Sequence, residues 1–462
     1  MIRYFKSKSL RLLLAVFLSA SVIAAGGCQN NASTASVASV YSNIENTNFV
    51  NSPELFELVE NNNKELAKSG FAEMRIPKHL HTVTRQEISR SCLYVADVLK
   101  SHGFKSYLTG GAVRDLLMGY KSNDFDILTD ATYEQLEKLL PDVSFHTIFN
   151  GQTFAYVPVD NEVVDVASIY NCPKALKGLA LVYQHPEVGV FQDDLISDAA
   201  TRDLAFNTLY YDLDTGDIID FSGGVNSILT GTIKATYPAA SAALENNPRS
   251  IYRTIRFISR YQMKVEESLN AGLLELAPKF ITAVSNRDYT RNLLKMDNKG
   301  FSKHSWDNMN KYNVLEGTFP AAKEDLKDSR YMAYMEDLLT RADATYPHKS
   351  KGYSCLMIGA ALWPAVERET QNSSLNTAIN KVLDVQKQIF DYKEQALREN
   401  LVSLFKHEYL MTHKAEISDM QAFCQSDYFA PALDILRSSA LNAPQLADDV
   451  RYFETMAEGY KK

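Results

Sequence analysis

Two short stretches close together in the chain decide the fold: Leu-Thr-Gly-Gly-Ala-Val-Arg-Asp at residues 108–115 and Asp-Phe-Asp at residues 124–126. Apolar residues before the glycine pair predict a short strand over residues 106–109, and residues 113–118 have the spacing of a short helix. Two glycines let backbone N–H groups approach a phosphate, and a following helix N-terminus favours negative charge. Arg114 is placed to pair with phosphate or to brace the acidic loop. A tight turn without any ligand is the plainer interpretation of the glycine pair alone.

The acidic residues are the second feature. Because side chains two apart project from the same face of a strand, Asp124 and Asp126 are expected side by side, with Phe125 pointing into the core. A third acid, Asp165, interrupts the apolar stretch 163–167 and would be costly to bury without a partner. Such carboxylates repel each other unless a divalent cation lies between them. They suit two Mg²⁺ ions, or Mn²⁺ in their place, that activate a hydroxyl and stabilise a triphosphate leaving group. Solvated acids at a loop edge are the alternative.

The rest of the chain divides into a mixed α/β part and a helical part. Apolar residues at helical spacing predict a helix over residues 87–100, and a capping box at Thr132 and Gln135 opens another. Strands are expected near residues 154–157 and 162–168, whereas strand signals almost vanish after Glu245. We therefore predict an α+β fold, an α/β head followed by a helical neck and body. The expected divisions are a signal peptide at 1–27, a flexible tether at 28–53, a head at 54–230, a neck at 231–320 and a body at 321–462.

The composition is that of an ordinary globular protein. The 462 residues are 45% hydrophobic and 23% charged with 5 cysteines, which argues against a disordered chain or a disulfide framework. The net charge of -8 argues against a generally basic nucleic-acid coat protein, so a phosphate-rich partner must meet a local basic patch. One helical face offers such a patch unless acidic neighbours pair with it: Arg249, Arg253, Arg256 and Arg260.

The first residues are typical of a secretory signal. Basic residues precede an apolar run from Leu12 to Ala25, which is too short for a comfortable membrane span. The run ends in small residues before Cys28, an ending that resembles the lipobox of bacterial lipoproteins and implies an exported chain anchored in a membrane by lipidated Cys28. An ordinary cleaved signal is the alternative. The remaining cysteines lack ligand spacing, so we expect free thiols and no zinc site at Cys92, Cys172, Cys355 and Cys424.

The glycine-rich stretch followed by Asp-x-Asp resembles the class II tRNA nucleotidyltransferase and bacterial poly(A) polymerase family, with the poly(A) polymerase branch the closer match. The resemblance covers roughly residues 75–320. It continues through further motifs in the same order: residues 81–89, Val163-Val164-Asp165-Val166-Ala167, residues 198–211, the Gly-Gly turn at 219–224, and Arg253, Arg256 and Phe257.

The resemblance implies a polymerase-beta-like head and metal-dependent, template-independent transfer of nucleotides, AMP from ATP, to an RNA 3′ end. Asp124 and Asp126 would bind the metals, and Asp165 would be the third catalytic carboxylate. The residues that would contact the nucleotide are Gly110, Gly111 and Arg114 on the triphosphate side, Arg202, Asp203 and Asn207 at the sugar and phosphates, and Asn247, Arg253 and Arg256 on the neck helix.

Several positions depart from the family pattern. The base-reading Glu-Asp-Pro-x-Arg of the family is Asn-Asn-Pro-Arg-Ser at residues 246–250. Asn247 can hydrogen-bond a base edge only without charge assistance, so we expect a weaker preference for ATP. Neutral residues also replace family arginines at 150–153, Tyr170 and Thr201. A second hypothesis follows, a catalytically impaired RNA- or partner-binding lipoprotein that keeps the fold.

Overall fold

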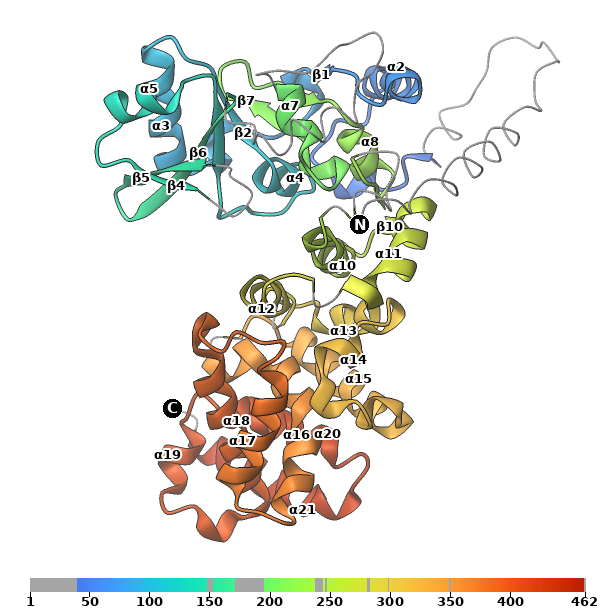
Figure 1. Ribbon diagram of the computed structural model, residues 1–462, viewed down its shortest axis with the longest axis vertical. Coiled ribbons are helices and arrows are strands. Elements are labelled where there is room, and N and C mark those ends of the chain that lie inside the picture. The colour runs from blue at the N-terminus through green and yellow to red at the C-terminus, as the bar shows by residue number, and fades with distance from the viewer. Residues whose placement is uncertain are drawn as a thin grey trace, which may run out of the picture. The chain divides into compact units, whose positions relative to one another are not determined.

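The computed structural model describes residues 40–147, 153–170, 195–236, 244–245, 247–280, 283–297, 299–348 and 350–460 (Figure 1). Residues 41–462 form one compact unit. The predicted signal sequence, Cys28, Cys172 and Asn246 lie outside the described residues. Within those residues, no helix combines the length and the apolar character needed to cross a membrane.

A single mixed sheet organises the N-terminal part. Among the described residues it has eight strands in the order β1-β8-β7-β2-β3-β6-β5-β4. Its neighbours pair antiparallel except for β3 and β6, which are parallel. A separate two-stranded pair joins β9 to β10. The strands are β1 Met74–Ile76, β2 Ser106–Thr109, β3 Asp126–Thr129, β4 Ser144–Thr147, β5 Thr153–Val159, β6 Glu162–Ser168, β7 Tyr210–Asp212, β8 Ile218–Asp220, β9 Thr232–Ile233 and β10 Lys264–Val265.

The two faces of this sheet have different environments. One face carries apolar residues of β3, β5 and β6 under helix α3 (Arg90–Ser101), and Phe145 of β4 meets Tyr133 of α5 (Tyr133–Leu139) on the same side (Figure 1). The opposite face is covered only in part, where α7 (Leu195–Ala200) packs on a buried cluster around Tyr107 and Leu128. Beyond α7, the described side chains on this face are half-buried at Tyr156 and Asp165 and exposed at Val163, and the acidic residues of β3 and β6 lie on it.

Local sequence signals explain the head elements. The predicted strands at 106–109 and 162–168 coincide with β2 and β6. The capping box at Thr132 and Gln135 forms and opens α5 as predicted. Helix α3 begins later than residue 87 because Ser89 caps it by accepting a hydrogen bond from the Cys92 N–H. The remaining helices of the head are α2 Pro53–Ser69, α4 Gly111–Leu117 and α8 Gly224–Leu229.

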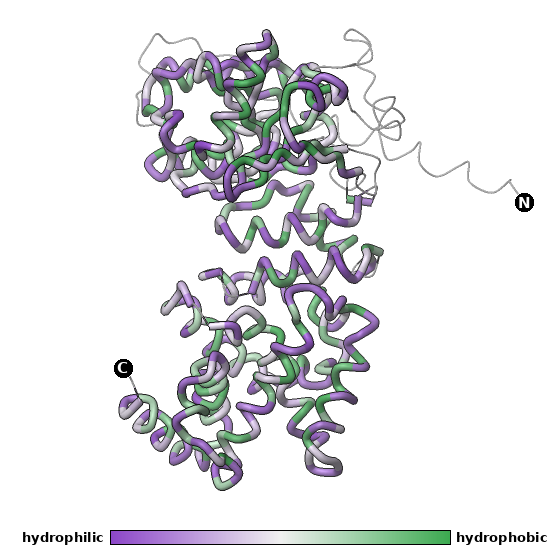
Figure 2. Tube along the Cα trace, turned by 90° about the vertical axis from the view of Figure 1, so that its left-hand side faces the viewer, coloured by the Kyte–Doolittle hydropathy of each residue, from purple (hydrophilic) through white to green (hydrophobic). Residues whose placement is uncertain are grey.

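The rest of the described chain is helical, as predicted, apart from short β10. Helix α10 (Arg249–Tyr261) buries an apolar stripe, and its arginines occupy the other side. Figure 2 shows polar and apolar residues alternating along these helices, the pattern of amphipathic helices packed on one face. They are α11 Glu267–Phe280, α12 Asn286–Leu294, α13 Ser302–Lys311, α14 Leu315–Thr318, α15 Ser329–Ala344, α16 Leu356–Thr370, α17 Leu375–Gln386, α18 Leu397–Thr412, α19 Met420–Cys424, α20 Phe429–Ser439 and α21 Ala447–Gly459.

The predicted tether extends too far along the chain. Tyr41 is 2% exposed and stacks on Phe56, with ring centroids 4.9 Å apart, and Ile44 and Phe49 are also buried. Aromatic and branched residues spaced along this stretch give it enough apolar surface to pack. The folded unit therefore begins near Tyr41 and not at residue 54. The expectation of free thiols holds for Cys92 and Cys355, which are buried, and for the partly exposed Cys424.

Candidate active site

The candidate site is built on one row of opposed residues that crosses the sheet. Thr109 of β2 faces Tyr210 on one side and Asp126 on the other. Continuing the parallel register of β3 and β6 by one residue sets Asp126 beside Asp165, and Tyr156 of β5 opposes Asp165. Because opposed residues share a face of the sheet, these side chains form a continuous strip: Tyr210, Thr109, Asp126, Asp165 and Tyr156.

The three predicted carboxylates come together, although not as the sequence predicted in detail. The strand begins at Asp126, so Asp124 lies in the preceding loop and is exposed. Phe125 is partly exposed and does not enter the core, because it lies in the loop before β3 and not in the strand. The stretch around Asp165 is buried on one face only, so this carboxylate is half-buried.

Burial and the neighbouring negative charges raise the pKa of two of these acids. Burial, followed by the charges of Asp124 and Asp165, raises the pKa of Asp126 to about 7. Burial and Asp124 also raise the pKa of Asp165. Arg202 acts in the opposite direction on Asp126 without cancelling these effects. Three mutually repelling carboxylates on one surface are the electrostatic environment that a bound cation would relieve.

Arg202 closes the glycine turn over the end of β2. Its guanidinium donates to Asp198 Oδ2 at 2.8 Å and to Thr109 Oγ1 at 2.8 Å. Gly110 has a φ of 68°, and a Cβ there would lie 2.8 Å from Nη1 of Arg202. Gly110 is thus required both by its backbone conformation and by the close approach of Arg202. At Gly111 an added Cβ would meet the Arg114 guanidinium at 3.4 Å, an ordinary contact.

Arg114 braces the structure, which is the second of its two predicted roles. It is 4% exposed, pairs with Asp115 at 2.8 Å and donates to Asn207. Asp115 also accepts from Arg260 at 2.9 Å and from the Tyr261 hydroxyl at 2.5 Å. This buried acid and two aromatic rings of α10 hold the Arg114 side chain, whose guanidinium carbon lies 4.7 Å from the ring centroid of Phe257 and 5.2 Å from that of Tyr261.

Asp203 and Arg253, both predicted to contact the nucleotide, form an ion pair with each other. Arg253 Nε lies 2.6 Å from Asp203 Oδ2, and the Asn207 amide donates to Asp203 Oδ1 at 3.1 Å. Arg253 and the hydrogen bonds together hold the pKa of buried Asp203 below its usual value, against the opposing effect of burial. These three residues form one network that positions α10 against the chain after α7.

Acidic neighbours also take up most of the predicted basic face of α10. Arg249 pairs with Asp288 at 2.6 Å, just as Arg253 and Arg260 have their own acidic partners. Arg256 differs, because its buried Nε has no hydrogen-bond partner among the described residues and its guanidinium lies 4.3 Å from the Phe257 ring. Burial, with Arg253 and Arg114, lowers the pKa of Arg256 to about 10.

Sequence reasoning missed three residues at this site. Asp198 orients Arg202 from four residues upstream, a helical spacing that was visible in the sequence. Asp115 is the last residue of the glycine-rich motif and joins α4 to α10. Lys295, after α12, gave no signal. Burial and the charges of Arg256 and Arg253 lower its pKa, whereas Asp124 raises it, so Lys295 lies between the α10 cations and the acids.

The other predicted positions lie apart from this network. Asn247 is exposed and keeps its side chain available to a base edge. Tyr170, where the family has arginine, is 50% exposed at the end of β6.

The donor set fits a hard divalent cation that a substrate helps to bind. Carboxylate oxygens are the ligands that Mg²⁺ prefers, and Mg²⁺ is usually held by one or two carboxylates together with waters and substrate phosphates. Within the described residues no group of three or more His, Cys, Asp or Glu side chains is arranged to hold an ion alone. Carboxylates in this arrangement would provide only part of a coordination shell, which phosphate oxygens would complete.

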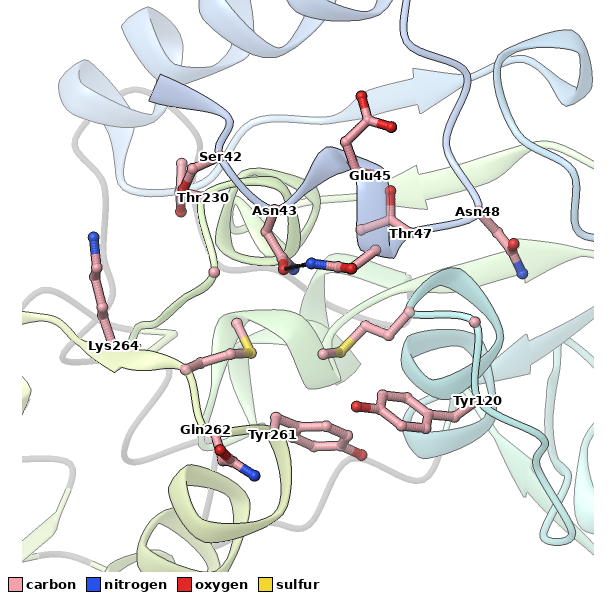
Figure 3. Close-up of a pocket in the computed structure, with 15 residues that line it drawn as sticks. Ser42, Asn43, Glu45, Thr47, Asn48, Tyr120, Thr230, Tyr261, Gln262 and Lys264 are labelled. Atoms are coloured by element: carbon pink, nitrogen blue, oxygen red, sulfur yellow. Dashed lines mark hydrogen bonds between the residues drawn. The ribbon is translucent and has the colours of Figure 1, made fainter. Parts of the chain in front are cut away.

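A polar cavity of about 650 Å³ lies elsewhere, between the segment 42–48, the end of α4 and the end of α10. Figure 3 shows the rings of Tyr120 and Tyr261 together at one wall and Asn43 at another. The Asn46 amide donates to Asn43 Oδ1 at 3.2 Å. None of the predicted site residues lines this cavity. It is therefore distinct from the acidic strip.

The chain is similar in sequence and in fold to several known proteins. A family model described as "Poly A polymerase head domain" matches residues 106–234. Poly(A) polymerase I of Escherichia coli O6:H1 is 26% identical over 329 residues, covering 67% of this chain and 70% of that protein. The CCA-adding enzyme of Geobacillus kaustophilus is 31% identical over 182 residues, covering 39% and 42%. The crystal structure of the Bacillus stearothermophilus CCA-adding enzyme in complex with CTP has a TM-score of 0.51 at 18% identity, covering 80% of this chain and 82% of that one.

The fold is thus an α+β nucleotidyltransferase fold, a mixed-sheet head with a helical C-terminal part. Residues 106–234 are similar to the poly(A) polymerase head domain, and the chain's homologues are named poly(A) polymerase I and CCA-adding enzyme.

Proposed function

We propose that this protein transfers nucleotides from an NTP, ATP by preference, to the 3′ end of an RNA without a template. The observation that carries the proposal is the convergence of Asp124, Asp126 and Asp165 on one open surface beside the glycine turn. The names of its homologues, poly(A) polymerase I and CCA-adding enzyme, point to the same chemistry.

In this proposal Asp124 and Asp126 hold Mg²⁺, two ions in the complete site, with Mn²⁺ able to replace them. The ions would neutralise the triphosphate and favour ionisation of the acceptor hydroxyl. Asp165 lies beside Asp126 on the next strand and accepts the proton of that hydroxyl or orients it. Arg256 and Lys295 would provide positive charge for the phosphate oxygens, with Lys295 close enough to Asp124 to interact with its charge.

The test is extension of a labelled RNA by the purified full chain with Mg²⁺ or Mn²⁺ and each NTP in turn. The double variant Asp124→Ala plus Asp126→Ala should lose at least about 10³-fold in rate, because the charge that holds the metals is gone. Asp160→Asn is a matched control, since Asp160 is exposed in the turn between β5 and β6 and its φ of 52° suits asparagine. Extension that persists in the double variant, or no extension with any NTP, contradicts the proposal.

The same assay addresses the nucleotide choice. Asn247 is exposed and uncharged, so discrimination between ATP and the other NTPs should be weaker than a charged base-reading residue would give. A modest preference for ATP over CTP would agree with this expectation, whereas equal use of the two would contradict a preference for ATP. Strict use of ATP alone would require a base-reading group other than Asn247.

A second candidate function is RNA or partner binding without turnover. It is favoured by the pairing of Arg114, Arg202 and Arg253 with carboxylates, which leaves fewer cations for a triphosphate. Tight, metal-dependent NTP binding that is lost in the Asp124 and Asp126 double variant would exclude it.

We also propose that the chain is exported and anchored in a membrane through a lipid on Cys28. The support is the order of basic residues, a short apolar run and small residues before that cysteine. Radiolabelled fatty acid should enter the full chain in bacterial cells and not the Cys28→Ser variant. Equal labelling of the two would disprove lipidation at Cys28.

A further inference from the structure

A stacked pair of aromatic rings continues the acidic strip beyond Asp165. The rings of His146 and Tyr156 lie with centroids 4.4 Å apart and planes at 23°. We propose that this pair, the ring platform, is the stacking site for the terminal base of the RNA acceptor. The inference rests on the proposed function, because it assigns the acceptor side of the same site.

The register places the ring platform next to the carboxylates. Tyr156 of β5 directly opposes Asp165 of β6, so their Cβ atoms are about 5 Å apart on a shared face. Ser144 of β4 opposes Tyr156, and His146, two residues further along β4, opposes Phe154 on the same face. The charge of His146 lowers the pKa of Asp165, the direction expected for a ring close to the carboxylate.

The ring platform and the neighbouring aromatic residue of β4, Phe145, lie on opposite faces of the sheet. Phe145 points to the opposite face, where it packs edge-on against Tyr133 of α5. His146 is exposed and Tyr156 is half-buried, and Val163 beside them is 62% exposed. Aromatic side chains on an open sheet face are a recurrent means of stacking single-stranded bases, and every base offers a face for it.

Position along the strip favours the acceptor base over the base of the incoming nucleotide. The glycine turn and Arg202 lie at the Thr109 end of the strip, and the ring platform lies at the Asp165 end. In-line transfer needs the acceptor hydroxyl and the leaving pyrophosphate on opposite sides of the reacting phosphorus. With the triphosphate at the glycine turn, the acceptor reaches Asp126 from the side of the ring platform.

The experiment uses the full chain and a short RNA whose 3′-terminal base is 2-aminopurine, whose fluorescence falls when it stacks on a ring. Without NTP, the wild type should quench this probe, and Tyr156→Ala should weaken RNA binding about 5- to 150-fold and remove most of the quenching. Tyr156→Phe keeps the ring and should behave as the wild type. In extension assays Tyr156→Ala should raise the KM for RNA and leave the KM for NTP within about twofold.

A matched control removes an exposed ring that lies away from the strip. Tyr94 of α3 is 50% exposed on the helix that covers the opposite face, so Tyr94→Ala should leave both KM values and the quenching unchanged. Unchanged RNA binding in Tyr156→Ala overturns the inference, and so does a rise in the KM for NTP alone, which would assign the rings to the incoming base. A wild type that binds no RNA overturns the proposed function as well.

Discussion

Among single residues, Glu408 of α18 is an unusual component of the helical core. It is 2% exposed, and its Oε2 atom has no hydrogen-bond partner among the described residues. Burial, followed by the charge of Glu367 on α16, raises its pKa well above the ordinary value. The neighbouring Tyr334 hydroxyl donates to the Ala360 carbonyl and so is not directed at this carboxylate. Folding therefore favours the protonated form of Glu408.

The raised pKa of Glu408 in the folded state determines how the free energy of unfolding changes with pH. Because the pKa is raised on folding, the native state binds more protons, and stability falls as pH rises above the unfolded pKa of about 4.3. Glu408→Gln removes this loss and should raise the free energy of unfolding at pH 7 to 8 by about 1–3 kcal/mol, with almost no gain at pH 4. Urea unfolding of the wild type and Glu408→Gln at several pH values measures this difference in the free energy of unfolding. Glu416→Gln, at an exposed glutamate, is the control, and equal pH profiles for wild type and Glu408→Gln would contradict the prediction.

The residues of the site show what a sequence can and cannot reveal. The strand pattern was enough to place Asp126 and Asp165 on neighbouring strands. It could not show that Asp124 precedes the strand, because strand ends depend on which backbone groups find partners. Nor could it find Lys295, which approaches Asp124 from a separate helix more than 150 residues later, a contact that only the tertiary structure creates.

Among the elements, α10 is joined to the rest of the protein through ion pairs of different burial. Asp115 on α4 is 6% exposed and accepts from Arg260 of α10 and from Arg114. Asp288 on α12 pairs with Arg249 at the start of the same helix, where the two side chains are 29% and 39% exposed. A helical pattern predicted the arginine stripe, but the acids that pair with it come from α4, α12 and the chain after α7, so the sequence could not distinguish a free basic face from a paired one.

Replacing the aspartate by asparagine should therefore have different effects in the Asp115 and Asp288 ion pairs. Asp115→Asn leaves Arg114 buried without its counter-charge and should cost about 3–5 kcal/mol in the free energy of unfolding. Asp288→Asn removes an exposed pair and should cost about 0–1 kcal/mol. Chemical denaturation of both variants provides the comparison. Similar costs for the two would show that Asp115 does not hold α10 in the way the contacts indicate.

For the whole molecule, the question is how a chain of net charge -8 binds a polyanion. Polyanion binding depends on cations that release condensed ions from the RNA, and a cation already paired within the protein releases fewer. Arg249, Arg253 and Arg260 each have an acidic partner, whereas Arg256 has none among the described residues. RNA affinity should therefore depend only weakly on salt, and the dependence should come from few side chains.

The variant Arg256→Gln tests whether the salt dependence of RNA affinity comes from this arginine. The slope of log affinity against log salt concentration for a single-stranded RNA should become shallower by about 0.7, the contribution of one phosphate contact. Arg249→Gln has the same change in net charge but removes a guanidinium already neutralised by Asp288, so its slope should match the wild type. Fluorescence anisotropy titrations between about 50 and 200 mM salt give the three slopes. The two variants change the net charge equally and differ only in whether the lost arginine had an acidic partner. If both flatten the slope equally, net charge governs RNA binding. A flatter slope for Arg256→Gln alone shows that the pairing along α10 decides which arginine contacts RNA.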